Sequence, residues 1–291
     1  MFYQQFAKRI ESQSIDNSKS PEFDTELIFS KLKQFREEVN QELGSSFTLE
    51  DSNIRVQGIR DLSHFPLGFC DIIRDRVYEK SKKEGLVQYL EEKGVVFKKV
   101  FGILNNSWFH NVFQIGNYIV DVSRDSIEGF DEFFVATPIK KSNFKNITSY
   151  DEVFEIMKKY WKVEVYPNIL FPEISLYFPY FLKYLDGEIH FKTTHFSIPL
   201  FNEFQSDFKW TIKFLNNNLN FKFDESLHKK FERLNKKFSH LFIQKNKDES
   251  LQQYLNKILE SRKSQDREKF DAQMMQKIYA QLDSFNRDLN N

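Results

Sequence analysis

Cys70 is the only cysteine of the chain, and it stands where a helix should begin. The turn-forming residues Pro66-Leu67-Gly68 precede it, and the stretch CDIIRDRVYEKSKKEGLVQYL that starts with it is helical in character. A thiol attacks as the thiolate, and the unpaired N–H groups at a helix N-terminus lower its pKa. The same N–H groups can bind a developing oxyanion. Cys70 is therefore the candidate nucleophile.

A series of strands should follow this helix. Residues 95–104, 108–115 and 117–123 are rich in β-branched and aromatic side chains, which is typical of strands. Gly116-Asn117 is a turn signal between the last two segments. The pattern predicts a tight hairpin within a small antiparallel sheet.

The hairpin register decides which polar side chains can meet. If Gly116-Asn117 is a two-residue loop, Ile115 pairs with Tyr118, and His110 and Asp121 fall on one face as diagonal neighbours. A four-residue loop keeps this parity, and a three-residue loop breaks it. We therefore expect His110 to be the base for the thiol and Asp121 to orient its imidazole. The alternative orienters are Asn111 and Ser123.

Two segments resemble the nucleophile and histidine segments of bacterial papain-like or transglutaminase-like cysteine proteins. They are HFPLGFC at 64–70 and FHNVFQIGNYIVDVSRD at 109–125. The positions that fit the family pattern are Phe65, Pro66, Gly68, Cys70, His110, Gly116, Val120 and Asp121. The resemblance covers about residues 56–130. It implies a catalytic triad of Cys70, His110 and Asp121 in a cleft between helix and sheet, and hydrolysis, deamidation or acyl transfer at an amide.

The same segments depart from the family pattern at three points. Phe69 stands where a small residue is common. Asp71 places a carboxylate beside the thiol, and this opposes thiolate formation if the side chain points inward. For the oxyanion side chain, which is a glutamine in the family, the candidates are Gln57 and His64.

The order of elements predicts an α+β protein with a papain-like or transglutaminase-like core and helical additions at both ends. The expected divisions are an N-terminal helical segment (1–53), the catalytic core (54–170), an aromatic and proline-rich extension (171–223) and a C-terminal helical region (224–291). In the first segment a helix is expected to end at Gly44. Its apolar face consists of Ile28, Leu32, Phe35, Val39 and Leu43. The aromatic run 161–184 is read as core packing rather than as a binding groove.

Composition excludes several other classes of protein. The 42 Lys and Arg residues balance the 42 Asp and Glu residues, so nucleic acid is not an expected partner. A single cysteine excludes intramolecular disulfides and multi-thiolate zinc sites, and His190 and His195 would point to opposite faces of an extended segment. We expect no metal and no cofactor. No stretch approaches the ~20 apolar residues of a membrane span, and no signal peptide is visible, so the expected protein is soluble and cytoplasmic, or exported without a Sec-type signal.

The leading hypothesis is a thiol-dependent hydrolase, such as a cysteine protease or deamidase, that acts on a protein or peptide. By analogy, such a chain would suit a bacterial effector that works inside a cell. The second hypothesis is an interaction module that keeps the core without turnover and binds a protein partner through its C-terminal helices. Asp71 and the missing oxyanion glutamine favour the second hypothesis. A nuclease on a similar core is a third, weaker hypothesis, against which the neutral charge counts.

Overall fold

The computed structural model describes residues 1–18, 20–46, 65–191 and 197–291, which form an α+β protein with two compact units. One unit comprises residues 9–146, and the other comprises residues 1–8 together with 147–291. The expected core at 54–170 is therefore divided differently, and its residues 147–170 lie in the second unit. The reason is packing: the rings of Tyr150 and Phe154 both contact Tyr180 and Trp210, far along the chain.

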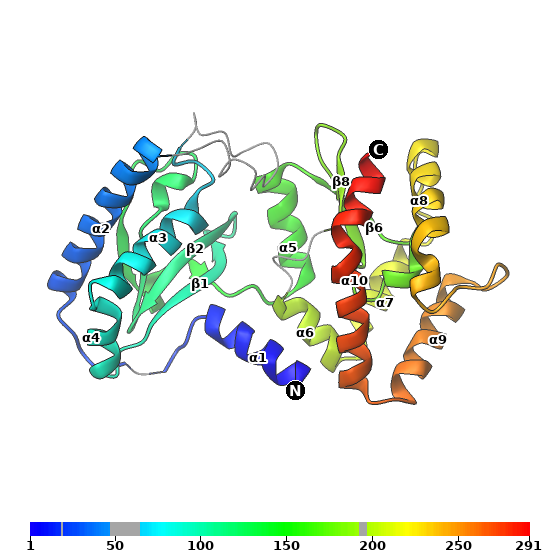
Figure 1. The fold of residues 1–291 in the computed structure, drawn as a ribbon, viewed down its shortest axis with the longest axis horizontal. Coiled ribbons are helices and arrows are strands. Elements are labelled where there is room, and N and C mark those ends of the chain that lie inside the picture. Colours follow the sequence, from blue (N-terminus) through cyan, green and yellow to red (C-terminus); the bar gives the residue numbers. More distant parts are fainter. Residues whose placement is uncertain (19, 47–64, 192–196) are drawn as a thin grey trace. The chain divides into compact units, whose positions relative to one another are not determined.

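The unit at 9–146 is built on a five-stranded antiparallel sheet (Figure 1). Its strand order is β4-β3-β2-β1-β5. The strands are β1 (Phe97–Leu104), β2 (Trp108–Ile115), β3 (Tyr118–Asp121), β4 (Val135–Pro138) and β5 (Phe144–Lys145). The three expected strands and the hairpin between β2 and β3 are confirmed, because Ile115 pairs with Tyr118.

Both faces of this sheet are covered, as the alternation of side chains in strands requires. Phe113, Ile115 and Val120 belong to a buried cluster with helices α2 (Thr25–Ser46), α3 (Cys70–Lys83) and α4 (Leu86–Glu92). These helices lie along one side of the sheet in Figure 1. Residues of opposite parity enter a second cluster, which includes Val100, Leu104, Val112, Ile119, Ile127 and Phe144. Two short 3-10 turns, at Arg124–Ser126 and Ile139–Lys141, connect the strands beyond β3.

The expected apolar face of α2 is confirmed. Its buried residues are Ile28, Leu32, Phe35, Val39 and Leu43. The Asp24 carboxylate accepts a hydrogen bond from the Leu27 N–H at 3.0 Å, which caps the start of the helix. The expected end at Gly44 is wrong, since the helix continues to Ser46. A glycine costs a helix only about 1 kcal/mol relative to alanine, so it permits an end without imposing one.

The second unit joins a small sheet to many helices. Its antiparallel sheet has the order β6-β7-β8, formed by β6 (Glu164–Pro167), β7 (Tyr180–Lys183) and β8 (Ile189–His190). The helices are α5 (Tyr150–Ile156), α6 (Ser197–Gln205), α7 (Lys209–Asn217), α8 (Glu225–Phe238), α9 (Leu251–Lys263) and α10 (Arg267–Asn290). Residues 224–291 are helical as expected, and Asp224, Ser250 and Asp266 cap the three helices. Helix α1 (Phe2–Gln13), which the sequence did not indicate, contains the boundary between the units.

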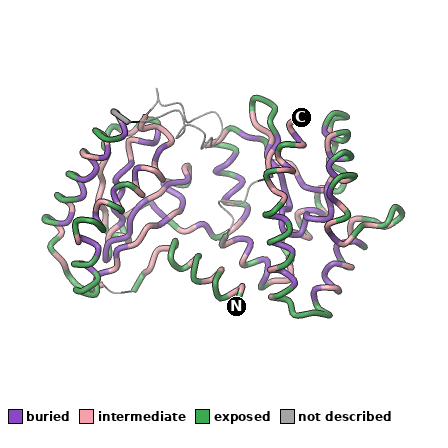
Figure 2. The backbone as a smooth tube through the Cα atoms, viewed as in Figure 1, coloured by how far each residue is buried: buried purple, intermediate pink, exposed green. Residues whose placement is uncertain are grey.

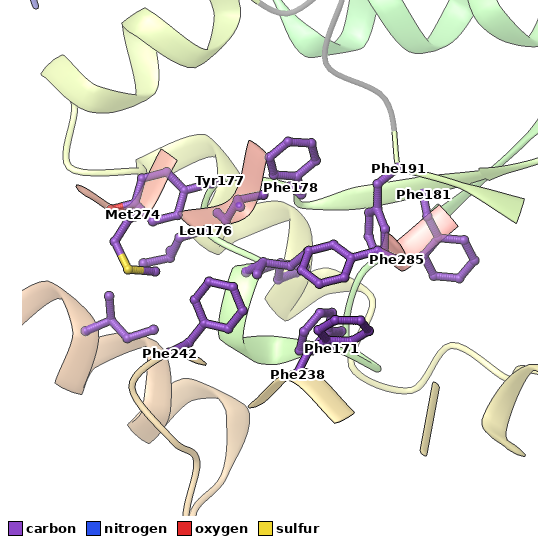
Figure 3. Packing of buried hydrophobic residues seen from close by; sticks show 14 of the residues in the cluster. Phe171, Leu176, Tyr177, Phe178, Phe181, Phe191, Phe238, Phe242, Met274 and Phe285 are labelled. Atoms are coloured by element: carbon purple, nitrogen blue, oxygen red, sulfur yellow. The ribbon is translucent and has the colours of Figure 1, made fainter. Parts of the chain in front are cut away.

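Aromatic rings fill the interior of the second unit. Buried and exposed residues alternate along its helices (Figure 2), and the buried ones meet in a cluster rich in phenylalanine (Figure 3). Phe285 of α10 contacts Phe171 and Phe238, with ring centroids 5.5 and 4.9 Å away. The expectation of core packing is confirmed for Phe171 and for the buried residues Tyr177, Phe178 and Phe181. Among the residues described, no helix has both the length and the apolar character needed to cross a membrane.

Candidate active site

Cys70 is the first residue of α3, as the sequence predicts, and its side chain is partly exposed. The first backbone hydrogen bond of the helix runs from Ile73 N–H to Phe69 C=O, so the N–H of Cys70 precedes the helical ladder. Gly68 has φ +78°, a left-handed conformation that favours glycine. Its N–H donates to Ser126 C=O at 2.9 Å, which ties the nucleophile turn to the segment after β3.

His110 and Asp121 meet as the hairpin register predicts. Nε2 of His110 lies 2.9 Å from Oδ1 of Asp121, and both residues are buried. A carboxylate only accepts hydrogen bonds, so Nε2 carries the proton and the lone pair of a neutral ring lies on Nδ1. The same Oδ1 accepts the Ser123 N–H at 3.0 Å. Asp121 is therefore the orienter of the imidazole, and Ser123 supports the carboxylate.

The thiol and the imidazole influence each other's pKa. Burial raises the pKa of the Cys70 thiol, but the influence of His110, helped by the Asn111 amide, outweighs it and lowers the pKa overall. Burial lowers the pKa of His110, but the charge and hydrogen bond of Asp121, helped by Cys70, raise it to about 10. Each group thus favours the charged form of the other. Nδ1 of His110 is buried and has no hydrogen-bond partner among the described residues.

A fourth residue, Asn111, also reaches the sulfur. Its Nδ2 donates to Sγ of Cys70 at 3.3 Å, and this hydrogen bond contributes to the lowered pKa of the thiol. Its Oδ1 accepts from Nη1 of Arg74 at 2.6 Å. The sequence reading named Asn111 only as an alternative orienter of His110 and missed this contact. One signal was available: Arg74 lies four residues after Cys70, so both side chains lie on one face of α3.

Successive strand residues normally point to opposite faces, yet His110 and Asn111 both approach Cys70. The pairing of the strands explains this. β2 pairs with β1 along its whole length, whereas its described pairing with β3 runs only from Phe113 to Ile115. At His110 and Asn111 the β3-side edge of β2 is thus open to the start of α3. The backbone C=O of Asn111 at this edge accepts instead from Ser123 Oγ at 3.4 Å.

Arg36 of α2 fixes the segment that follows Asp121. It is fully buried, its Nε donates to Val122 C=O at 2.6 Å, and its Nη2 contacts both carboxylate oxygens of Asp125 at 2.9 and 2.8 Å. Burial lowers the pKa of Arg36, and the charge of Asp125 opposes that shift. The helix therefore holds the loop that carries the orienting carboxylate.

The second carboxylate oxygen of Asp121 is not used in the contact with His110. Oδ2 is buried, accepts no hydrogen bond from the described residues, and lies 3.9 Å from Nη1 of Arg124. A cavity of about 120 Å³ borders Asp121 and is lined by side chains that include Arg124, Thr137 and Lys141. The polar lining is of the kind that buried water requires.

The remaining sequence candidates lie elsewhere. Gln57, His64 and His195 fall outside the described residues. His190 Nε2 lies 3.0 Å from Glu188 Oε2, and no cluster of three or more His, Cys, Asp or Glu residues suited to a metal occurs in residues 1–18, 20–46, 65–191 and 197–291. Asp71 opposes the other influences on Cys70, because its charge raises the pKa of the thiol. The direction of this influence is the one that the sequence led us to expect.

Comparison of the chain with protein-family models, with curated proteins and with solved structures found no match. What the site can do must be derived from its own geometry. It combines a partly exposed thiol of lowered pKa, an imidazole of raised pKa, a carboxylate that fixes the imidazole, and an amide that donates to the sulfur.

Proposed function

We propose that the chain is a thiol-dependent hydrolase that cleaves or transfers the acyl group of a protein or peptide amide. One observation carries the proposal. Asp121 binds one ring nitrogen of the buried His110, the other ring nitrogen has no hydrogen bond to a described residue, and His110 lowers the pKa of Cys70, which begins helix α3. A structural cysteine needs no oriented base.

The chemistry follows from the charges of the pair. The Cys70 thiolate attacks the carbonyl carbon, a C–S bond forms, and the carbonyl π electrons move to oxygen. When the oxyanion collapses, the C–N bond breaks and the His110 imidazolium gives the Nδ1 proton to the departing amine. Neutral His110 then takes a proton from a water molecule that attacks the thioester carbonyl. The C–S bond breaks, the carboxylic acid is released, and the thiolate–imidazolium pair is restored. Asp121 holds the ring in one orientation and stabilises its charge throughout.

The resemblance to papain-like and transglutaminase-like cysteine proteins supports the same reaction class. A helix that begins at the nucleophile, packed on an antiparallel sheet that carries the histidine, is the arrangement which that resemblance implies. Protease, deamidase and acyl-transfer activities share these steps and differ in the nucleophile or the leaving group. We further propose that the protein acts in a reducing, cytoplasmic setting, as a bacterial protein would, because its one cysteine must remain a thiol.

The test is covalent labelling by a peptide vinyl sulfone, a thiol-reactive mimic of a peptide amide. We expect rapid labelling at pH 7 on Cys70 alone, complete loss in Cys70→Ser and strong slowing in His110→Ala. His190→Ala is the matched control, since His190 pairs with Glu188 and not with the site. Labelling of the folded wild-type protein at the rate of free cysteine would refute the proposal.

A second candidate is a non-catalytic module that binds a protein partner through its C-terminal helices. The observation in its favour is the charge of Asp71, which raises the pKa of Cys70 against the influence of His110. In addition, one surface of α8 carries four cations, Lys229, Lys230, Arg233 and Lys236, against two carboxylates, Glu225 and Glu232, and this excess of positive charge fits an acidic partner. For this candidate, vinyl sulfone labelling would be slow, whereas reversing the charge of Lys230 and Arg233 would abolish partner binding.

A further inference from the structure

We infer that Asn111 is the oxyanion-binding side chain of the site, donating first to the Cys70 thiolate and then to the oxygen that receives its negative charge. This inference rests on the proposed function and deepens it. The primary contact is the Nδ2–Sγ hydrogen bond of 3.3 Å. Neither Gln57 nor His64, the sequence candidates for this role, is needed for it.

The amide is held in one orientation by Arg74. Nη1 of Arg74 donates to Oδ1 of Asn111, and the guanidinium is held in turn by Asp75 Oδ1 at 2.9 Å from Nε and by Val100 C=O at 3.3 Å from Nη1. Rotating the amide by half a turn would place its NH₂ against the guanidinium, donor against donor, and its oxygen against the sulfur. Because the guanidinium only donates hydrogen bonds, the amide oxygen must face Arg74, and Nδ2 therefore faces Sγ. Arg74 is thus a positioning residue.

A fixed donor beside the sulfur serves two successive states. In the resting site the amide can donate but offers no acceptor to Sγ, so it favours the thiolate over the thiol. On attack, the S–C bond forms and the charge passes to an oxygen that is only two bonds from Sγ. A donor already aimed at the sulfur lies within reach of that oxygen, as does the N–H of Cys70 at the start of α3.

This role has an experimental signature that a purely structural role lacks. Alkylation by iodoacetamide displaces iodide and forms no oxyanion, whereas acylation by p-nitrophenyl acetate passes through one. Nitrophenolate leaves without a proton, so the His110 acid step does not contribute. The ratio of the two second-order rate constants at one pH also cancels the fraction of thiolate. It therefore reports oxyanion binding alone.

We expect the acylation-to-alkylation ratio to fall about 10²-fold in Asn111→Ala and in Asn111→Asp, in line with the loss of one oxyanion donor. The aspartate keeps the shape and the Arg74 contact, so it preserves the test if the alanine variant fails to fold. Arg74→Met should lower the ratio by a smaller factor, because the amide is then free to turn. Asn117→Ala, an exposed amide in the β2–β3 turn, is the matched control and should leave the ratio unchanged.

Two results would overturn the inference, and they are distinguishable. In the first, the acylation-to-alkylation ratio of the wild type is well above that of N-acetylcysteine and stays so in both Asn111 variants. This result would remove Asn111 from the oxyanion site and leave the proposed hydrolase intact. A wild-type ratio equal to that of N-acetylcysteine, with iodoacetamide alkylation at the free-thiol rate, would remove the proposed function and the inference together.

Discussion

Arg262 in the second unit and His110 in the first are both buried ionisable residues beside a buried aspartate. Arg262 donates to both carboxylate oxygens of Asp271, to Asp207 at 2.5 Å, to the Tyr3 hydroxyl and to a backbone carbonyl. His110 donates once, to Asp121, and its other nitrogen has no hydrogen bond to a described residue.

The difference separates a structural cluster from a reactive one. Around Arg262 the hydrogen bonds and charge of Asp271 outweigh burial and raise the pKa of the guanidinium, so Arg262 keeps its charge near neutral pH. Around His110 the raised imidazole pKa faces a lowered thiol pKa, and one proton can move between them. Burial and ion pairing alone therefore do not mark the site. The proposed site is distinguished by a buried ring nitrogen without a hydrogen bond to a described residue and by a thiol of lowered pKa.

The largest effect should come from removing the cation of the structural cluster around Arg262. Arg262→Met leaves the fully buried Asp271 carboxylate without its cation and should lower the free energy of unfolding by about 3–5 kcal/mol. The double variant Arg262→Met/Asp271→Asn should recover part of this loss, because no buried charge remains. Urea denaturation measures both. Wild-type stability in the single variant would mean that Arg262 contributes nothing to the fold.

The next largest effect should come from removing the charge of Asp121, the carboxylate that binds His110. Asp121→Asn removes the charge that raises the His110 pKa, so the imidazolium should be lost at lower pH and iodoacetamide alkylation of Cys70 at pH 7 should fall about tenfold. Asp131→Asn, an exposed carboxylate on a nearby loop, is the control. Equal rates in the two variants would mean that Asp121 has no electrostatic effect on the site.

The smallest effect concerns Asp71, whose charge raises the Cys70 pKa and which lies in the first turn of α3. Asp71→Asn should lower the thiol pKa further and speed alkylation below that pKa by a few-fold. The loss of an acidic residue at a helix start should cost about 0.3–1 kcal/mol of stability. Stopped-flow alkylation measures the change in rate, and urea denaturation measures the change in the free energy of unfolding. Slower alkylation would assign Asp71 a supporting role in the site.

The sequence was sufficient for those parts of the site that depend on local rules. Gly68 before Cys70 predicted the helix start, and Gly116 fixed the hairpin register that brings His110 to Asp121. These inferences need only turn chemistry and the two-residue period of strands.

What the sequence could not provide depends on contacts between distant segments. The Asn111–Cys70 contact requires that the start of α3 lie against the face of β2 that carries Asn111, and the role of Arg36 requires α2 to lie against the loop after β3. The unit boundary after Asn146 arises because residues 150 and 154 pack on rings near 180 and 210. Hydrophobic periodicity gives the buried face of an element but not the surface that covers it.

The central claim is that Cys70 and His110 form an ion pair, and the pH dependence of alkylation tests it most directly. In the wild type the thiolate should form below the ordinary thiol pKa of 9.0, and the imidazolium should persist until about pH 10. These shifts also make the stability of the fold depend on pH. The raised pKa of His110 adds stability that is fully present below pH 6.5 and is lost as the pH rises through 10. The lowered pKa of Cys70 adds stability that is present above pH 9.0 and is lost as the pH falls through the pKa of the folded state.

The test is the rate of iodoacetamide alkylation from pH 4 to 11 in the wild type and in His110→Ala, with folding checked at each pH. The account predicts a wild-type profile that rises at a pH well below the ordinary thiol pKa of 9.0, and a variant profile that shifts upward to or beyond that value. Superimposable profiles with a midpoint near that of a free thiol would contradict the account and leave Cys70 as a packing residue.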